Sequence, residues 1–274
     1  MINAIIYWNV DPTIINLTDS LPLKYYGLLW AIGLMSAFVV VKRIYKKEGI
    51  PIENLENLTV YVFIGAFLGA RLGHCLFYEP MYYLQHPLEI LLPITFVDGS
   101  VKFIGFQGLA SHGGTLGIMI SIIIYGKKTK TNILWILDRV AIASAITAMF
   151  IRIGNLMNSE IYGKPTNGDW GVVFQRDDMI PRHPTQAYEA FSYLLIFIIL
   201  SYVYYTPKIK KHNGLIVGLL FILLFSARFI IEFFKENQEH FEDTMSINMG
   251  QILSIPFIIA GFVLIFWKKK IPNN

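Results

Sequence analysis

The sequence contains few charged residues and a single cysteine. Charged residues occupy 15% of the 274 positions, against about 25% in ordinary soluble domains. Hydrophobic residues occupy 54%, with 20 Phe and 15 Tyr. A chain of this composition would expose large apolar patches in water, so the composition predicts an integral membrane protein. Cys75 alone excludes an intrachain disulfide framework.

Several motifs of known catalytic chemistry are also missing. The sequence has no Gly-x-Ser-x-Gly, His-Glu-x-x-His, Walker loop or Cys-x-x-Cys. We expect neither a metal nor a cofactor. The net charge of +4 fits basic cytoplasmic loops better than a nucleic-acid-binding surface, so we expect no nucleic-acid partner. The first residues lack the Lys/Arg-rich start of a secretory signal peptide, so we expect no cleaved leader.

What the chain does contain is a series of about seven apolar segments. Six of them cover residues 28–41, 58–77, 133–151, 186–205, 215–234 and 250–267. The other, third in chain order, is a glycine-rich stretch that runs into residues 118–125. A helix needs about 20 apolar residues to cross a bilayer. The third segment is preceded by several glycines, so we expect that helix to begin broken or unwound. The sequence predicts an all-α polytopic membrane protein, one integral membrane domain over residues 1–274.

Three further segments are expected outside the spans. Residues 1–24 mix apolar and polar side chains and are expected to form an amphipathic arm on the membrane surface. The connection after the second span is expected to include a short interfacial helix. Residues 156–185 carry the turn signals Pro165, Asn167-Gly168 and Pro181, and are expected to form a small loop region with a short strand at Trp170–Phe174.

The basic residues predict the orientation. Thirteen of the 23 Lys and Arg follow the first, third, fifth and seventh spans, and cytoplasmic loops carry the excess of such residues. The N-terminus is therefore predicted outside, the C-terminus in the cytoplasm and residues 156–185 outside. Six spans then deliver polar side chains to the outer leaflet; these are Tyr26, Arg71, His74, His112, Arg152, Asn155, His183, Arg228 and Glu232.

The densest polar stretch follows the fourth span and reads Ile151-Arg152-Ile153-Gly154-Asn155-Leu156-Met157-Asn158-Ser159-Glu160-Ile161-Tyr162-Gly163. Ionisable residues at the end of a span are rare and usually face a site or a water-filled cavity. The stretch resembles the signature of the prolipoprotein diacylglyceryl transferases, roughly Gly-Arg-(Leu/Ile)-Gly-Asn-Phe-x-Asn-Gly-Glu-x-x-Gly. Two signature glycines are replaced, by Ile151 and Ser159.

Other blocks extend the resemblance over nearly the whole chain, in order. They are Tyr25-Tyr26-Gly27, Ser111-His112-Gly113-Gly114, His183-Pro184-Thr185-Gln186-x-Tyr188-Glu189 and Arg228-Phe229-Ile230-Ile231-Glu232. The resemblance implies transfer of the diacylglyceryl group of phosphatidylglycerol to the lipobox cysteine of a prolipoprotein. The product is a thioether, and glycerol phosphate is released. The implied partners are phosphatidylglycerol, other membrane lipid and prolipoprotein signal peptides, in the bacterial cytoplasmic (inner) membrane with the active site toward the outer leaflet.

This chemistry assigns expected roles. The cysteine thiol must lose its proton, and the developing phosphate charge must be stabilised. His112 is the expected base, and Arg152 and Arg228 the expected phosphate ligands. Arg152 has no carboxylate one turn before it, whereas Glu232 follows Arg228 by one turn. Lipid binding is expected from Tyr26, Arg71, Arg152, Asn155, Glu160, Gly163 and Glu232.

Alternative interpretations stay open at this point. The pair Arg228 and Glu232 suits a structural intramembrane ion pair equally well, and Glu189 could pair with another arginine. An arginine-dominated field could activate the thiol without His112. The alternative function is a polytopic carrier or binding protein for an anionic lipid or solute. A carrier needs polar groups that lead to both faces of the membrane. The cytoplasmic half of the predicted spans contains mainly Asp138 and Arg139, which favours the transferase.

Overall fold

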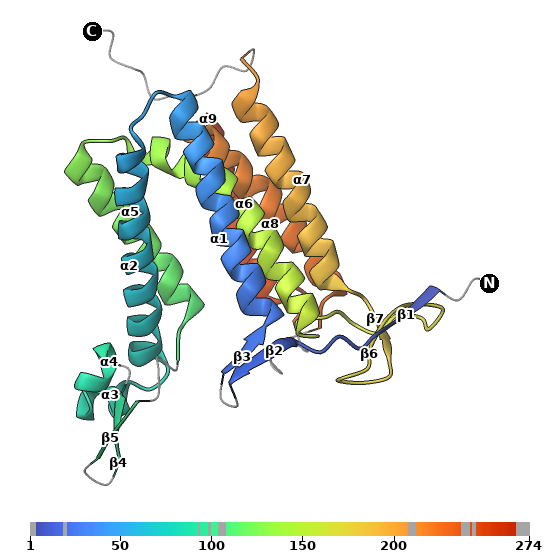
Figure 1. Cartoon of the computed structure of the whole chain (residues 1–274). Coiled ribbons are helices and arrows are strands. Elements are labelled where there is room, and N and C mark those ends of the chain that lie inside the picture. Colours follow the sequence, from blue (N-terminus) through green and yellow to red (C-terminus); the bar gives the residue numbers. More distant parts are fainter. Residues whose placement is uncertain are drawn as a thin grey trace. The chain divides into compact units, whose positions relative to one another are not determined.

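The computed structural model describes residues 4–18, 21–92, 94–97, 100–103, 108–207, 212–236, 242 and 245–266. The long helices are α1 (Tyr25–Lys47), α2 (Ile52–Phe77), α5 (Ser111–Thr129), α6 (Ile133–Met157), α7 (Thr185–Tyr205), α8 (Leu215–Ile231) and α9 (Met249–Phe266) (Figure 1). The short helices are α3 (Pro80–Gln85), α4 (Leu88–Leu91) and the 3-10 turn η1 (Glu232–Phe234). A short helix was predicted in the connection after α2, and the structure has two there, α3 and α4.

The described residues also contain seven strands, of which the sequence predicted one. They are β1 (Ala4–Trp8), β2 (Thr13–Thr18), β3 (Leu21–Lys24), β4 (Ile94–Val97), β5 (Ser100–Phe103), β6 (Trp170–Phe174) and β7 (Pro181–Arg182). The protein is mostly helical, but the all-α prediction is too strong. The strand predicted at Trp170–Phe174 is confirmed: β6 lies between β1, which is parallel to it, and β7, which is antiparallel.

Six helices in the described residues are long and apolar enough to cross a membrane. They are α1, α2, α6, α7, α8 extended by η1, and α9. They coincide with six of the seven predicted spans, although Trp267, the predicted end of the last, lies outside the described residues. The remaining segment forms α5, whose first half is rich in glycine and whose last turn carries Lys127 and Lys128. The count of seven spans therefore stays a prediction.

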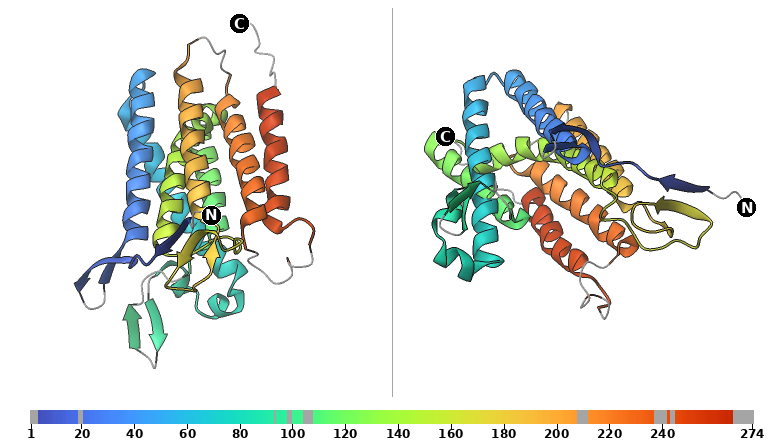
Figure 2. Two further views of the ribbon diagram at one scale, coloured as in Figure 1. Left: turned by 90° about the vertical axis from the view of Figure 1, so that its right-hand side faces the viewer. Right: turned by 60° about the horizontal axis from the view of Figure 1, so that its bottom comes forward.

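The described chain divides into two compact units. One contains residues 1–44 and 137–274, and the other contains residues 45–136. In the second unit, α2 packs against α5, and the hairpin β4–β5 follows α3 and α4. In the first unit, α7 packs against α8 and α8 against α9, as the yellow, orange and red helices in Figure 2 show.

The glycines of α5 are packing residues. The helix is continuous from Ser111, so the predicted broken start is wrong for the described residues; Gly105 lies outside them. A Cβ on Gly117 would lie 1.9 Å from the carbonyl oxygen of Gly65, and one on Gly113 would lie 2.3 Å from that of Gly69. Small residues allow two helix backbones to approach this closely in a membrane. The sequence pattern indicates close packing rather than an unwound helix.

We expect Gly117→Ala to destabilise the unit of residues 45–136, because its methyl group has no room beside Gly65. Overpacking of this kind costs roughly 1–3 kcal/mol. The measurement is folded yield and thermal stability of the purified protein. Gly27→Ala is the matched control, since a Cβ there would meet nothing within 4 Å. Equal stability of the two variants would contradict the close packing.

In the first unit, α6 is held near both of its ends. The carboxylate of Asp138 accepts hydrogen bonds from the backbone N–H groups of Gly214 (2.8 Å) and Val217 (2.9 Å), at the start of α8. Near its other end, Gly154 of α6 leaves room for the Tyr26 ring, which a Cβ there would approach to 2.9 Å. Asp138, which the sequence offered as an inner polar group, is thus a buried helix cap.

The N-terminal segment is made of strands. β1 pairs with β6, whereas β2 and β3 form an antiparallel hairpin that leads directly into α1. The segment Ala4–Trp8 reads Ala-Ile-Ile-Tyr-Trp, which is rich in β-branched and aromatic residues. The location of residues 1–24 on a membrane surface stays a prediction.

Candidate active site

The candidate site lies where α1, α7 and α9 begin and α6 and α8 end. Thr185 and Gln186, at the start of α7, donate side-chain hydrogen bonds to the carbonyl oxygens of Ile161 (3.0 Å) and Glu160 (2.7 Å). Gln251 of α9 donates to the carbonyl oxygen of Phe229 in α8 (3.3 Å). The bonds from Thr185 and Gln186 hold the polar stretch after α6 against α7, and the bond from Gln251 joins α9 to α8.

The turn after α6 places Asn155 and Glu160 together. Nδ2 of Asn155 donates to Oε1 of Glu160 at 2.7 Å, and Nδ2 of Asn158 donates to the same oxygen at 3.2 Å. Ser159 has a φ of +56° and Ile161 a φ of +59°, both in the left-handed region. Glycine adopts this conformation without strain, which explains why the resembled signature has glycine where this chain has Ser159. The bend forms with serine in that place.

Arg152 does have a carboxylate partner, supplied by another helix. Its Nε lies 2.9 Å from Oε2 of Glu189 in α7, and its Nη1 donates to Oδ1 of Asn155 at 3.2 Å. The absence of a carboxylate one turn before Arg152 therefore does not leave this arginine unpaired. The expectation that Glu189 pairs with another arginine is confirmed. The Arg152 side chain stays 20% exposed, whereas Glu189 is 1% exposed.

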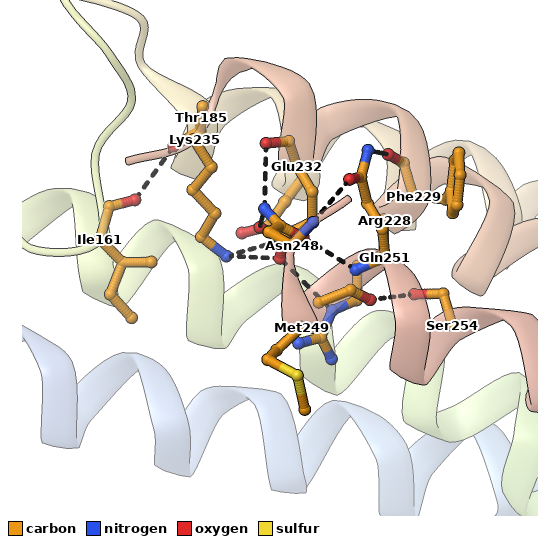
Figure 3. Close-up of polar contacts among 12 residues, drawn as sticks. Ile161, Thr185, Arg228, Phe229, Glu232, Lys235, Asn248, Met249, Gln251 and Ser254 are labelled. Carbon is orange, nitrogen blue, oxygen red and sulfur yellow. Dashed lines mark hydrogen bonds and ion pairs between the residues drawn. The ribbon is translucent and has the colours of Figure 1, made fainter. Parts of the chain in front are cut away.

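Arg228 and Glu232 form the predicted ion pair, with 3.5 Å between Nε and Oε1. Glu232 lies in η1 and also accepts a hydrogen bond on Oε2 from Nδ2 of Asn248, at 3.2 Å (Figure 3). A Cβ on Gly250 would lie 2.5 Å from the Glu232 carboxylate, so this glycine makes room for it. The Arg228 side chain is 36% exposed.

Sequence reasoning missed Lys235, which is buried within the same cluster. Its Nζ lies 3.5 Å from Oε1 of Glu189 and 3.5 Å from Oε1 of Glu232. The sequence placed this residue at the start of a mostly acidic loop. The available signal was the three-residue spacing from Glu232, which places both side chains on one face of a helical turn.

Gly163 lies where three segments meet. Its N–H donates to the carbonyl oxygen of His183 (2.8 Å), and a Cβ would lie 2.4 Å from the carbonyl oxygen of Phe234. The ring of His183 lies among Trp170, Phe234 and Tyr188, with ring centroids 5.0, 5.1 and 6.2 Å away. Partial burial lowers the pKa of His183 and so favours its neutral form.

Arg182 ties the connection after α6 together. It hydrogen-bonds to Asp178 (Nη2 to Oδ2, 2.6 Å) and Glu236 (Nη1 to Oε1, 2.7 Å), and its guanidinium lies 4.8 Å from the centre of the Tyr162 ring. The hydrogen bonds from Arg182 lower the pKa of the Asp178 carboxyl. This network links β7 to residues just after η1 and thereby holds the connection in place.

Two predicted site residues lie in the unit of residues 45–136. Arg71 is buried and donates to the backbone carbonyl oxygens of Ile90 (2.9 Å), Glu89 and Gly108 (3.3 Å). These bonds give it a structural part in holding the segment after α2. His112 is exposed in the first turn of α5. The site in the first unit thus brings together Tyr26, Arg152, Asn155, Glu160, Gly163, Arg228 and Glu232.

This arrangement suits an anionic ligand. Two partly exposed guanidinium groups lie next to buried carboxylates, and guanidinium groups bind phosphate oxygens through paired hydrogen bonds. The described residues contain no group of three or more His, Cys, Asp or Glu that could hold a metal ion. The geometry supports charge stabilisation and positioning by side chains.

Comparison with known proteins identifies the family. A family model described as "Prolipoprotein diacylglyceryl transferase" matches residues 12–267. A Bacteroides fragilis protein named phosphatidylglycerol–prolipoprotein diacylglyceryl transferase is 50% identical over 97% of this chain and 96% of its own length. Proteins of the same name from Tolumonas auensis and Campylobacter curvus are 46% and 36% identical, over 97% of this chain and 98% and 96% of their own lengths. The chain belongs to the prolipoprotein diacylglyceryl transferase family.

Proposed function

We propose that this protein transfers the diacylglyceryl group of phosphatidylglycerol to the thiol of the lipobox cysteine of a prolipoprotein. The observation that carries the proposal is the pair of partly exposed arginines, Arg152 and Arg228, next to buried carboxylates at the ends of apolar helices. A phosphodiester is the anionic group of the lipid, and a lipid reaches helix ends from within the bilayer. Family membership supports the same reaction.

The reaction breaks the bond between a glyceryl carbon and a phosphate oxygen and forms a carbon–sulfur bond. The electron pair stays on the phosphate, which leaves as glycerol phosphate, and the thiol proton is removed. Arg152 and Arg228 hold the phosphate oxygens as their charge increases. His112 accepts the thiol proton. Tyr26, Asn155, Glu160 and Gly163 shape the headgroup site, and Glu232 orients Arg228.

The topology proposal has the N-terminus outside and the C-terminus in the cytoplasm, with α5 as the third of seven spans. The basic clusters at the ends of α1 and α5, and those after α7 and α9 in the sequence, support it. The cluster at the end of α6 then faces the outer leaflet. We expect topology reporters to signal cytoplasm when fused after Lys47, Lys130, Lys211 and Lys270, and outside when fused near Gln85, Asn167 and Gln238. A cytoplasmic signal at Asn167 would contradict the outer-leaflet location.

The activity is tested with purified protein, phosphatidylglycerol and a lipobox peptide. We expect the peptide to gain the mass of one diacylglyceryl group and glycerol phosphate to appear in equal amount. A peptide in which serine replaces the lipobox cysteine is the control and should stay unmodified. Movement of lipid between leaflets without any peptide product would favour the carrier and refute the transferase.

A further inference from the structure

Lys235 connects the two arginine–glutamate pairs of the site. Its Nζ lies 3.5 Å from Glu189, which pairs with Arg152, and 3.5 Å from Glu232, which pairs with Arg228. Figure 3 shows the Lys235 side chain extending toward Glu232 beside Asn248. The five ionised residues thus form a row of alternating charge, Arg152–Glu189–Lys235–Glu232–Arg228, referred to below as the charge row.

The charge row is exposed only at its two ends. The side chains of Arg152 and Arg228 are 20% and 36% exposed, whereas the Lys235 side chain is 5% exposed and the two carboxylates are 1% and 8% exposed. A lipid phosphate therefore meets the arginines and not the lysine. Lys235 acts on the ligand only through the carboxylates, and burial strengthens these interactions by excluding water.

The number of charges indicates what Lys235 contributes. The charge row contains three cations and two carboxylates, and Glu160, joined to Arg152 through Asn155, adds a third carboxylate. The charge row and Glu160 together are therefore neutral with Lys235 and have a net charge of −1 without it. Without the lysine, each arginine would also be matched by its own carboxylate. The net negative charge would then repel an approaching phosphodiester, and both arginines would already be paired with carboxylates.

We propose that Lys235 is a positioning residue that shares Glu189 and Glu232 with the arginines and so leaves Arg152 and Arg228 able to bind the lipid phosphate. When the arginines turn to the phosphate, both buried carboxylates keep a cation beside them. An uncompensated buried charge would otherwise oppose binding strongly. The proposal rests on the function proposed above and adds a determinant of affinity for anionic lipid.

The test compares Lys235→Met with Lys235→Arg. Methionine keeps the buried volume and removes the charge, whereas arginine keeps the charge. We expect Lys235→Met to raise the apparent KM for phosphatidylglycerol, measured as mole fraction in mixed micelles, about ten- to one-hundred-fold. Turnover at saturating lipid should change much less, because the lost interaction acts on bound substrate and transition state alike. Lys235→Arg should keep a KM near that of the wild type.

The double variant Lys235→Met with Glu189→Gln removes one charge of each sign and restores neutrality. We expect its KM to return toward the wild-type value. A purely structural brace would not produce this rescue, because the double variant lacks both buried charges of the bridge. The double variant also has one fewer buried carboxylate than Lys235→Met, so it serves as the deciding variant if Lys235→Met does not accumulate in folded form.

Lipid binding measured without peptide separates this proposal from the proposed function. Equal affinity of wild type and Lys235→Met for phosphatidylglycerol would overturn the role of Lys235, as would a double variant as weak as the single one. A wild-type protein that binds the lipid but forms no thioether would count against the transferase, and the affinity comparison would still decide the role of Lys235.

Discussion

Arg152→Lys should abolish most diacylglyceryl transfer while leaving the fold intact. The Arg152 guanidinium reaches Glu189 and Asn155 with two different nitrogens, and a lysine ammonium cannot hold both and a phosphate in the same geometry. Charge-assisted hydrogen bonds to phosphate contribute about 1.5–3 kcal/mol each, so losing one or two should slow turnover roughly ten-fold to ten-thousand-fold. The measurement is the initial rate of thioether formation at saturating lipid and peptide.

The matched control is Arg139→Lys, which makes the same substitution in the first turns of the same helix. Arg139 lies over the ring of Tyr204, with 5.9 Å from the guanidinium carbon to the ring centroid, and has no role in the proposed chemistry. Its transfer rate should stay near that of the wild type. Full activity in Arg152→Lys would show that the arginine of the signature stretch acts only as a point charge.

His112→Asn should lose most transfer and still bind phosphatidylglycerol. General-base catalysis is typically worth 10²- to 10⁴-fold, and the exposed imidazole in the first turn of α5 is replaced by an amide that accepts no proton near neutral pH. The measurements are the transfer rate and the lipid affinity, made on the same preparation.

His212→Asn provides the comparison for this experiment. His212 is exposed, and its Nε2 lies 3.1 Å from the carbonyl oxygen of Ile265. It lies at the opposite end of the unit from Arg152. Its replacement should leave transfer unchanged. A residual rate within about threefold of wild type in His112→Asn would be too small a loss for a base, and the arginine field would then be the remaining means of activating the thiol.

The hydropathy of the sequence predicted the long helices better than it predicted the segments that connect them. Six predicted spans coincide with helices that are long and apolar enough to cross a membrane, because apolar length alone identifies a membrane helix. The sheet of β1, β6 and β7 was largely missed, since its strands are short and β1 pairs with a segment more than 150 residues away in the sequence. The glycines of α5 were interpreted wrongly, because the same glycine-rich pattern occurs in unwound helices and in helices that pack closely against a neighbour.

The candidate site was predicted in part. Arg152, Asn155 and Glu160 stand in one short stretch, so their proximity follows from the sequence, and the pair of Arg228 and Glu232 follows from helical spacing. Partners from other helices do not follow from such spacing. Glu189 reaches both Arg152 and Lys235 from α7, so spacing along the chain indicated only the contact of Lys235 with Glu232.

The division of the chain into two units has a consequence for how the protein is made. The unit that contains α1 is completed only by residues 137–274, so roughly ninety residues must be synthesised between α1 and its partner α6. At about 5–20 residues per second, the wait is about 5–20 seconds. During this time α1 must persist in the bilayer without the hydrogen bond from Thr147 to the carbonyl oxygen of Gly33. Only 17% of the residues in its apolar 18-residue stretch are buried even in the finished fold, which suits a helix that enters the membrane early and contacts its neighbours late.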